Sequence, residues 1–257
     1  MIYAMSDMHG YLDALRESME RITLRPEDRL VLLGDYIDYG PESGPTLRYI
    51  YALQKEHGTN RVIVLRGNHE ELLLDWLDAY SGPRARQSDA DGFGPWSDWL
   101  TTDPELKCFR TMISYFQWKL FQRLAKTAPA QALNAEAARM VLTANGELMA
   151  WLRQLPYYYE TERQIYVHAA IDEEAGDWWR YGTEEGVFTG KYPPTTGRFP
   201  KDVIAGHVGT AGLAGHPDFH GVYFDGQSHY FLDGTVGVSG HIPILAYDEE
   251  SGNYMEL

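Results

Sequence analysis

The chain has 257 residues, 44% of them hydrophobic and 23% charged, which suits a single domain over residues 1–257 with a substantial apolar core. Its formal net charge of −15 argues against nucleic acids and anionic membranes as partners, and no apolar run is long enough to span a membrane. The lone cysteine, Cys108, excludes an internal disulfide, and together with an N-terminus that lacks the features of a signal peptide it predicts a cytoplasmic protein.

In the first eighty residues one pattern occurs three times: an apolar stretch, a short polar cluster and a segment with helical periodicity. The apolar stretches are Ile2–Met5, Leu30–Leu33 and Val62–Leu65. The periodic apolar residues that follow them are Leu12, Leu15, Met19 and Ile22, then Leu47, Ile50 and Leu53 before Gly58, and then Leu72, Leu73, Trp76 and Leu77. Continuous apolar strands that alternate with helices predict parallel βαβ units, whose ligand-binding residues lie beyond the carboxyl ends of the strands.

Residues 81–155 interrupt this pattern. Gly, Pro, Ser and Asp are frequent over 81–95, which predicts a loop, and residues 105–155 then show helical periodicity. We predict that 81–155 form a helical cap inserted into the α/β core. The apolar faces of its helices contain Phe109, Met112, Ile113, Phe116 and Leu120, followed by Leu148, Leu152 and Leu155. Because periodic aromatic residues usually pack together, we expect the cap to bury its own aromatic side chains, Tyr115, Phe116, Trp118 and Phe121.

Strand signals return in the last hundred residues. Gln164–Val167 leads into His168, and Val203–Ala205 leads into His207. The tail from Val222 to Tyr247 has short apolar stretches separated by turns that contain glycine. This spacing predicts an antiparallel sheet that completes the fold.

Almost every good metal-binding side chain at the end of a predicted strand lies in one of five clusters. The clusters are Asp7 with His9, Asp35 with Asp38, Asn68 with His69, His168, and His207. Taken singly, each has an ordinary explanation as a turn or as a buried histidine. Five such clusters at strand ends favour a joint metal site, and their carboxylate, imidazole and amide groups suit Mn, Fe or Zn better than Ca.

The order and spacing of these clusters form a set of motifs. In chain order they are Asp7-x-His9-Gly10, Gly34-Asp35-x-x-Asp38-x-Gly40, Gly67-Asn68-His69-Glu70, His168 and Gly206-His207. The set resembles the metallophosphoesterase (calcineurin-like) superfamily. The chain is similar to its bacterial phosphoprotein (serine/threonine-type) phosphatase branch, close to the symmetrical diadenosine tetraphosphatases. Thr111-x-x-Ser114-Tyr115 and Leu232-Asp233-Gly234 match that branch less specifically. The resemblance implies an α/β fold: a β-sandwich flanked by helices.

The resemblance also implies roles around two divalent ions, with Mn as the first choice and Fe or Zn as alternatives. The ligands it implies are Asp7 and His9 for the first ion, Asp35 as the bridge, and Asn68, His168 and His207 for the second ion. The pair of ions would activate a water molecule for in-line attack on phosphorus. His69 would protonate the departing oxygen, and Asp38 would fix the tautomer of His69.

Two residues bear on the substrate. The branch usually has Arg after the second Asp of its second motif, where this chain has Tyr39. Tyr offers one neutral hydrogen bond, whereas the charged guanidinium group of Arg binds a phosphate through two. Arg180 lies where the family often has a phosphate-binding Arg, although an exposed surface role fits it equally well. Glu70 and Glu71 are expected to open a helix through their charge rather than to act in catalysis.

The expected function is hydrolysis of phosphomonoesters, in a phosphorylated protein or a small molecule. The alternative is hydrolysis of a dinucleoside polyphosphate or another phosphodiester, which Tyr39 keeps open because an adenine could contact nearby aromatic residues. A metal-binding scaffold without activity is a third hypothesis. The His69–Asp38 pair argues against the scaffold, because a scaffold needs no general acid.

Overall fold

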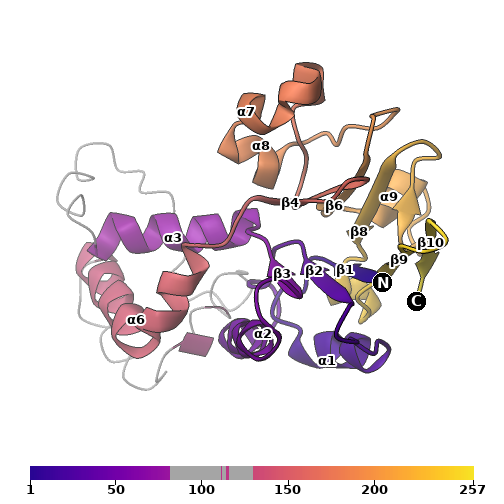
Figure 1. Ribbon diagram of the computed structural model, residues 1–257. Coiled ribbons are helices and arrows are strands. Elements are labelled where there is room, and N and C mark those ends of the chain that lie inside the picture. The colour runs from indigo at the N-terminus through magenta and orange to yellow at the C-terminus, as the bar shows by residue number, and fades with distance from the viewer. Residues whose placement is uncertain (82–110, 112–113, 116–129) are drawn as a thin grey trace.

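The computed structural model of the protein describes residues 1–81, 111, 114–115 and 130–257. Two five-stranded sheets pack face to face, and helices cover the outer side of each sheet (Figure 1). The fold is therefore the β-sandwich flanked by helices that the sequence predicts.

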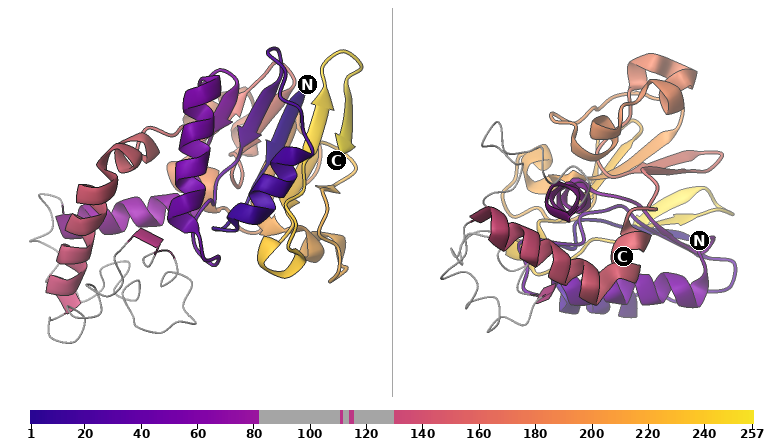
Figure 2. Two further views of the ribbon diagram at one scale, coloured as in Figure 1. Left: turned by 90° about the horizontal axis from the view of Figure 1, so that it is seen from below. Right: turned by 90° about the vertical axis from the view of Figure 1, so that its left-hand side faces the viewer.

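The first sheet is built from both ends of the chain. Its strands are β1 (Ile2–Met5), β2 (Arg29–Leu32), β3 (Val62–Val64), β9 (Leu245–Asp248) and β10 (Asn253–Glu256). The helices α1 (Leu12–Glu20), α2 (Ser43–His57) and α3 (Asn68–Ser81) follow β1, β2 and β3. The strand order is β10-β9-β1-β2-β3. As predicted, β1, β2 and β3 are parallel, while β9 and β10 extend the sheet as antiparallel strands. The crossover helices α1 and α2 lie side by side over this sheet (Figure 2).

The second sheet has three parallel strands at its centre. Its strands are β4 (Tyr158–Glu160), β5 (Gln164–Val167), β6 (Asp202–Gly209), β7 (Tyr223–Phe224) and β8 (His229–Asp233), in the order β4-β5-β6-β8-β7. The short helices of this half are η3 (Glu173–Trp178), α7 (Trp179–Gly182), α8 (Glu185–Gly190), α9 (Thr210–Ala214) and α10 (Val236–Ser239). Here β5, β6 and β8 are parallel, and β4 and β7 are antiparallel edge strands.

The prediction of one antiparallel sheet for the tail, Val222 to Tyr247, is wrong. β7 and β8 join the second sheet, where β8 runs parallel to β6, whereas β9 pairs with β1 in the first sheet. The reason is visible in β8, where Phe231 packs with the outer helices and its neighbour Leu232 packs between the sheets. A strand buried on both faces fits the interior of a sheet, and turn residues alone do not identify its partners.

Burial on two sides explains the continuous apolar strands. In β1, Ile2 and Ala4 face the second sheet, whereas Tyr3 and Met5 face the helices. Successive side chains of a strand point to opposite faces, so both faces need apolar residues when both are covered. Polar side chains therefore collect in the loops at the strand ends, where the motifs lie.

The helix predicted for the second half of 81–155 is present as α6 (Ala130–Leu152). It packs against α3, where Trp76 Nε1 donates a hydrogen bond of 2.8 Å to Asn134 Oδ1. Buried Tyr115 packs with α6 in the core that covers the first sheet. An inserted cap over 81–155 stays a prediction, because many of its residues lie outside the described part of the chain, among them Cys108, Phe109, Met112, Ile113, Phe116, Trp118, Leu120 and Phe121.

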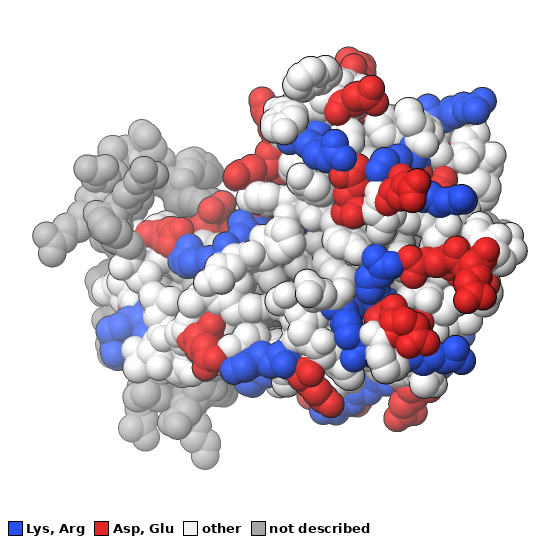
Figure 3. Space-filling view, in the orientation of Figure 1, with Lys and Arg blue, Asp and Glu red and all other residues white. Residues whose placement is uncertain are grey.

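Charges of both signs share the surface. On the face shown in Figure 3, Lys and Arg side chains lie among Asp and Glu side chains and do not gather into one basic area. Such a face provides no extended positive surface for a nucleic-acid backbone. Among the helices in the described ranges, none is both long enough and apolar enough to cross a membrane.

His229 forms a buried cluster with two carboxylates on the outer side of the second sheet. Its Nε2 lies 2.9 Å from Glu173 Oε1, and its Nδ1 lies 3.1 Å from Asp225 Oδ2. Burial alone would lower the pKa of His229, but hydrogen bonds and charge attraction from Glu173 and Asp225 outweigh burial and raise it. The cluster therefore ties β8 to η3 and to the turn after β7.

We expect this cluster to make stability depend on pH. Because the pKa of His229 is raised in the folded protein, its contribution is complete below about pH 6.5 and is lost as the pH rises through the folded value. His229→Gln should lower the free energy of unfolding by about 3 kcal/mol at pH 6 and by less at pH 8.5. Urea unfolding of both proteins at the two pH values measures the difference, and an equal loss at both would contradict the expectation.

Candidate metal centre

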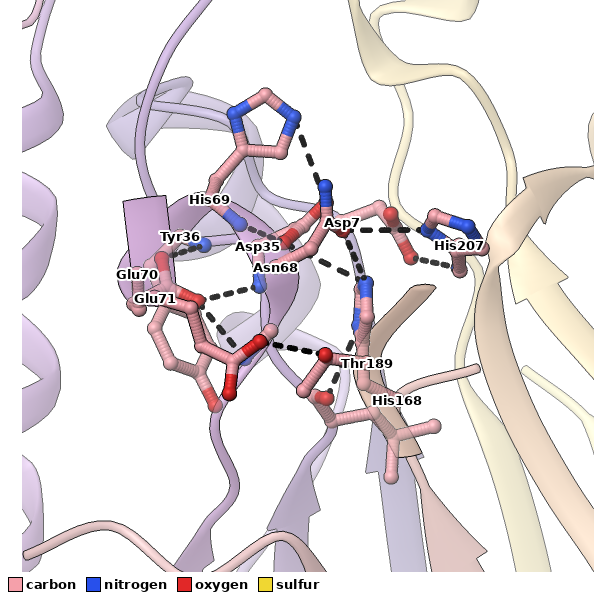
Figure 4. A network of polar contacts seen from close by, with 12 residues as sticks. Asp7, Asp35, Tyr36, Asn68, His69, Glu70, Glu71, His168, Thr189 and His207 are labelled. Carbon is pink, nitrogen blue, oxygen red and sulfur yellow. Dashed lines mark hydrogen bonds and ion pairs between the residues drawn. The ribbon is translucent and has the colours of Figure 1, made fainter. Parts of the chain in front are cut away.

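The two sheets bring the six predicted ligands together, and Figure 4 shows five of them, Asp7, Asp35, Asn68, His168 and His207. The first sheet supplies Asp7 and His9 after β1, Asp35 after β2, and Asn68 at the start of α3; the second supplies His168 after β5 and His207 within β6. The sequence predicts that the strand ends at Ala205, before His207, but β6 continues to Gly209. Its pairing with β8 is irregular between Ala205 and Gly209, so His207 lies in a distorted part of the strand.

Short distances join the side chains of this group. His168 Nε2 lies 3.0 Å from Asn68 Oδ1 and 3.4 Å from Asp35 Oδ1. His207 Nδ1 lies 3.2 Å from the same Asn68 oxygen. Asn68 therefore stands between the two histidines of the second sheet, in the place that the predicted ligand set requires.

Two of the histidines have a fixed orientation. His9 Nδ1 lies 2.9 Å from the carbonyl oxygen of Ile37, and His168 Nδ1 lies 3.2 Å from that of Leu33. Because a carbonyl oxygen only accepts, each Nδ1 carries a proton, and each Nε2 faces Asp35, at 3.8 Å and 3.4 Å respectively. A lone pair on Nε2 aimed at a carboxylate is repulsive unless a proton or a metal ion lies between them, so the arrangement fits metal ligands.

The buried carboxylates favour positive charge on His168. Burial alone would lower the pKa of His168, but nearby carboxylates, Asp35 first among them, raise it to about 9. Burial also opposes ionisation of Asp35, yet the surrounding histidines hold its pKa below the usual range. Protons or metal ions must balance the negative charge that is concentrated here, and divalent ions do so most strongly.

Two sets of ligand atoms can each surround one ion. The sets are His9, Asp35 and His69, and Asp35, His168 and His207, and within each set the ligand atoms lie within 4.8 Å of one another. Asp35 belongs to both sets, as the predicted bridge requires. Asp7 belongs to neither set; its Oδ2 accepts the backbone N–H of His207 at 3.0 Å, and its Oδ1 lies 3.7 Å from His9 Nε2.

The backbone of the site is strained. Among the described residues, the non-glycine residues with positive φ are Asp7, His9, Asp35, Asp38, Tyr39, His207 and Thr235. All except Thr235 were predicted as site residues from the sequence. Such conformations cost about 1–3 kcal/mol each and persist where the surrounding structure holds them. Here the first loop is bonded to the second, since Asp7 N–H donates to Gly34 O at 3.1 Å and His9 N–H donates to Asp35 O at 2.9 Å.

Gly206 allows β6 to approach β1 closely enough for the site to form. A Cβ at this position would collide with Ser6 Oγ and Asp7 Oδ2. Any larger residue would therefore push His207 away from Asp7. The Gly206-His207 motif is thus explained by close packing as well as by the ligand.

Glu70 supports the site more than its sequence position suggests. Its carboxylate accepts the backbone N–H of Gly67 at 3.0 Å, which caps α3 as expected for a residue that opens a helix. It also accepts the N–H groups of Asp35 at 2.9 Å and Tyr36 at 2.8 Å. Burial, and then the charge of Asp35, raise the pKa of Glu70 to about 7. Glu70 therefore fixes the loop that carries the shared aspartate, whereas Glu71 accepts a hydrogen bond from Thr189 Oγ1 at 2.6 Å (Figure 4).

His69 and Asp38 form a buried pair. His69 Nδ1 lies 2.5 Å from Asp38 Oδ2, and the backbone N–H of His69 donates to Asp35 Oδ1 at 3.0 Å. The other ring nitrogen, Nε2, faces the centre, 3.8 Å from Asp35 Oδ2. This is the geometry expected of a histidine whose Nδ1 is held by a carboxylate while its Nε2 exchanges a proton with the substrate.

A cavity of about 470 Å³ opens over the centre. Its lining includes Tyr39, whose ring lies edge-on to His9 at a centroid distance of 4.8 Å. The rest of the lining includes Asp233, from the Leu232-Asp233-Gly234 motif, together with Tyr11 and Thr235 to Val238, which the sequence did not identify. Asp233 Oδ1 accepts the N–H of Thr235 at 2.8 Å, so the Leu232-Asp233-Gly234 motif shapes the cavity rim.

Arg180 lies apart from this cavity. On α7, its Nε donates to Glu160 Oε2 at 2.7 Å, and its guanidinium lies over the Trp179 ring at 5.1 Å. It does not belong to the described cavity lining. The structure thus gives Arg180 a surface ion pair, and a phosphate-binding role for it stays a prediction without structural support.

Comparison with known proteins agrees with the resemblance read from the motifs. A sequence profile of the family described as calcineurin-like phosphoesterase matches residues 1–244. The symmetrical bis(5′-nucleosyl)-tetraphosphatase of Pseudomonas putida (strain GB-1) is 35% identical over 107 residues, which is 38% of this chain and 34% of that protein. The enzyme of the same name from Pseudomonas fluorescens (strain SBW25) is 40% identical over 73 residues, 28% of this chain and 24% of that protein. The matched part is thus only about a third of these relatives or less.

Solved structures share the fold. The crystal structure of a candidate diadenosine tetraphosphatase has a TM-score of 0.55 and 16% identity, and the match covers 100% of this chain and 92% of that one. A cold-active protein-tyrosine phosphatase of a Shewanella species has a TM-score of 0.55 and 15% identity, with 100% and 80% covered. At such low identity these similarities establish the fold alone.

Proposed function

The chain belongs to the calcineurin-like phosphoesterase family and is a metal-dependent phosphoesterase, and from this premise we propose that it hydrolyses the phosphoanhydride bond of a dinucleoside polyphosphate. The observation that supports hydrolysis is the pair of ligand sets that share Asp35 beneath an open cavity. The names of the curated relatives support the substrate class. The sequence alone favours phosphomonoesters and keeps this substrate as the alternative.

The described cavity lining fits a nucleotide. It contains no Lys or Arg, and Tyr39 stands where a cation would bind a terminal phosphate. Tyr11, Tyr39 and Val238 supply apolar surface beside the ligands, and Tyr39 is 45% exposed. Polar ligand groups with apolar surface beside them suit a phosphate chain that carries a base.

Each residue has a proposed part in the reaction. The proposed ligands are Asp7, His9 and Asp35 for one divalent ion, and Asp35, Asn68, His168 and His207 for the other, with Mn as the first candidate and Fe or Zn as alternatives. When bound, these ions supply Lewis acidity that lowers the pKa of water and neutralises phosphoryl charge. His69 Nε2 donates a proton to the departing oxygen, and Asp38 keeps the Nδ1 proton of His69 in place.

Phosphomonoesters, whether in proteins or in small molecules, are the second candidate. The buried His69–Asp38 pair favours them, because an alkoxide or phenolate leaves poorly without a proton, whereas the phosphate leaving group of an anhydride is already a weak base. The two candidates therefore differ in how much they depend on His69.

A substrate comparison tests the proposal. The purified protein with Mn should show its highest kcat/KM on diadenosine tetraphosphate, ahead of an aryl phosphomonoester, its diester and a phosphopeptide, and a chelator should abolish all activity. A preference for the phosphopeptide would replace the proposed substrate by the second candidate. Activity that survives removal of divalent ions would overturn the metal-dependent mechanism.

A further inference from the structure

A chain of buried hydrogen bonds continues behind the His69–Asp38 pair. Asp38 and Thr111 are both fully buried. Asp38 Oδ2 contacts His69 Nδ1, and its other oxygen, Oδ1, accepts the hydroxyl proton of Thr111 at 2.5 Å. Both oxygens of the carboxylate are therefore held, one by the histidine and one by a threonine 73 residues away in the sequence.

The direction of the remaining protons follows from this contact. Thr111 has one hydroxyl proton, which goes to Asp38, so the Ser43 hydroxyl must be the donor in its contact of 2.8 Å with Thr111 Oγ1. Ser43 Oγ in turn accepts the backbone N–H of Asp38 at 3.0 Å. Asp38, Ser43 and Thr111 thus form a closed ring of hydrogen bonds that fixes the plane of the carboxylate.

Ser114, three residues after Thr111, attaches Thr111 to α2. Ser114 Oγ accepts the backbone N–H of Gly44 at 2.9 Å and donates to the Thr111 carbonyl at 2.6 Å. The side chain of Thr111 bonds to Asp38 and Ser43, and to none of the predicted metal ligands. Its effect on the site therefore passes through Asp38 and His69.

We infer that Thr111 is a positioning residue for the general acid: its hydroxyl orients Asp38, and Asp38 orients His69. The inference rests on the proposed role of His69 in proton donation. The Thr111-x-x-Ser114 spacing fits this role, because Thr111 orients Asp38 while Ser114 holds Thr111 against α2. Without the hydroxyl, the Asp38 carboxylate is free to turn, and His69 Nε2 loses its fixed direction.

The consequence depends on the leaving group. A good leaving group, such as nitrophenolate, departs without a proton and is insensitive to the orientation of His69. Phenolate is more basic, with a conjugate acid of pKa about 10, and needs the proton. A defect in positioning should therefore grow with the basicity of the leaving group, whereas a general structural defect should affect every substrate equally.

The test measures kcat for p-nitrophenyl phosphate and phenyl phosphate in four variants of the full chain. Thr111→Val, which keeps the shape, should lose about 10- to 100-fold on phenyl phosphate and no more than about twofold on the nitro compound. Thr111→Ser restores the hydroxyl and should recover phenyl phosphate hydrolysis. His69→Asn removes the general acid and gives the largest loss of kcat on phenyl phosphate that a positioning defect could reach. Thr46→Val, the matched control at a buried threonine of α2 outside this ring of hydrogen bonds, should change both substrates by the same factor.

Proton NMR of the zinc-loaded protein gives a second reading that does not depend on turnover. The downfield signal of the His69 Nδ1 proton, identified by its loss in His69→Asn, should shift or broaden in Thr111→Val and stay in place in Thr111→Ser. If Thr111→Val does not fold, Ser43→Ala replaces it, since Ser43 donates to Thr111 in the same ring.

Two results would distinguish a failure of the role inferred for Thr111 from a failure of the role proposed for His69. An equal loss on both substrates in Thr111→Val, with the NMR signal unmoved, would reduce Thr111 to a structural residue while the role of His69 stands. If His69→Asn itself shows no dependence on the leaving group, the proposed general acid is wrong, and the inference falls with it.

Discussion

Asp35→Asn should lower kcat/KM by at least about 1000-fold and reduce the bound metal from two ions per chain to one or none. The side chain belongs to both sets of ligand atoms, so its loss affects both ions at once. Asparagine keeps the shape and one oxygen, but it lacks the charge that three nearby histidines require. Since Asp35 is 2% exposed, no water molecule can easily take its place.

The measurement is metal content by mass spectrometry together with steady-state kinetics. Asp13→Asn is the matched control, because Asp13 is an exposed residue of α1 whose partner, Arg16, is also exposed. The control should keep both ions and full activity. Asp35→Asn protein that binds two ions and turns over at the normal rate would disprove the shared-ligand arrangement.

The part of the site that the sequence predicts depends on strand ends. Asp7, Asp35 and Asn68 each follow an apolar stretch, and the carboxyl ends of parallel strands meet at one edge. His168 lies after a parallel strand of the other sheet. Spacing and residue type therefore identify these residues without knowledge of the packing between the sheets.

The rest of the site depends on contacts that cross the fold. Thr111 reaches Asp38 from the segment predicted as a cap, and no local pattern reveals that its hydroxyl is buried against a carboxylate. The position of Arg180 depends on the path of the chain through η3 and α7, which directs it to Glu160. Asp233 enters the cavity because β8 joins the second sheet in parallel, the pairing that the sequence did not predict.

His69 Nε2 lies near enough to Asp35 to belong to a metal set as well as to donate a proton to the substrate. The two roles predict different results for His69→Asn. As a general acid, His69 is required only for proton transfer, so the variant should keep both ions.

For the same variant, kcat should fall by about 100- to 10,000-fold on phenyl phosphate and much less on p-nitrophenyl phosphate, where the leaving group needs no proton. As a ligand, His69 would be needed for an ion, and the variant should lose metal and decline equally on both substrates. We expect the first result, because the short contact from Nδ1 to Asp38 supports an imidazole that gains and loses a proton. Metal analysis and the two kinetic measurements on one preparation distinguish the roles, and a loss of one ion with no dependence on the leaving group would assign His69 to the metal.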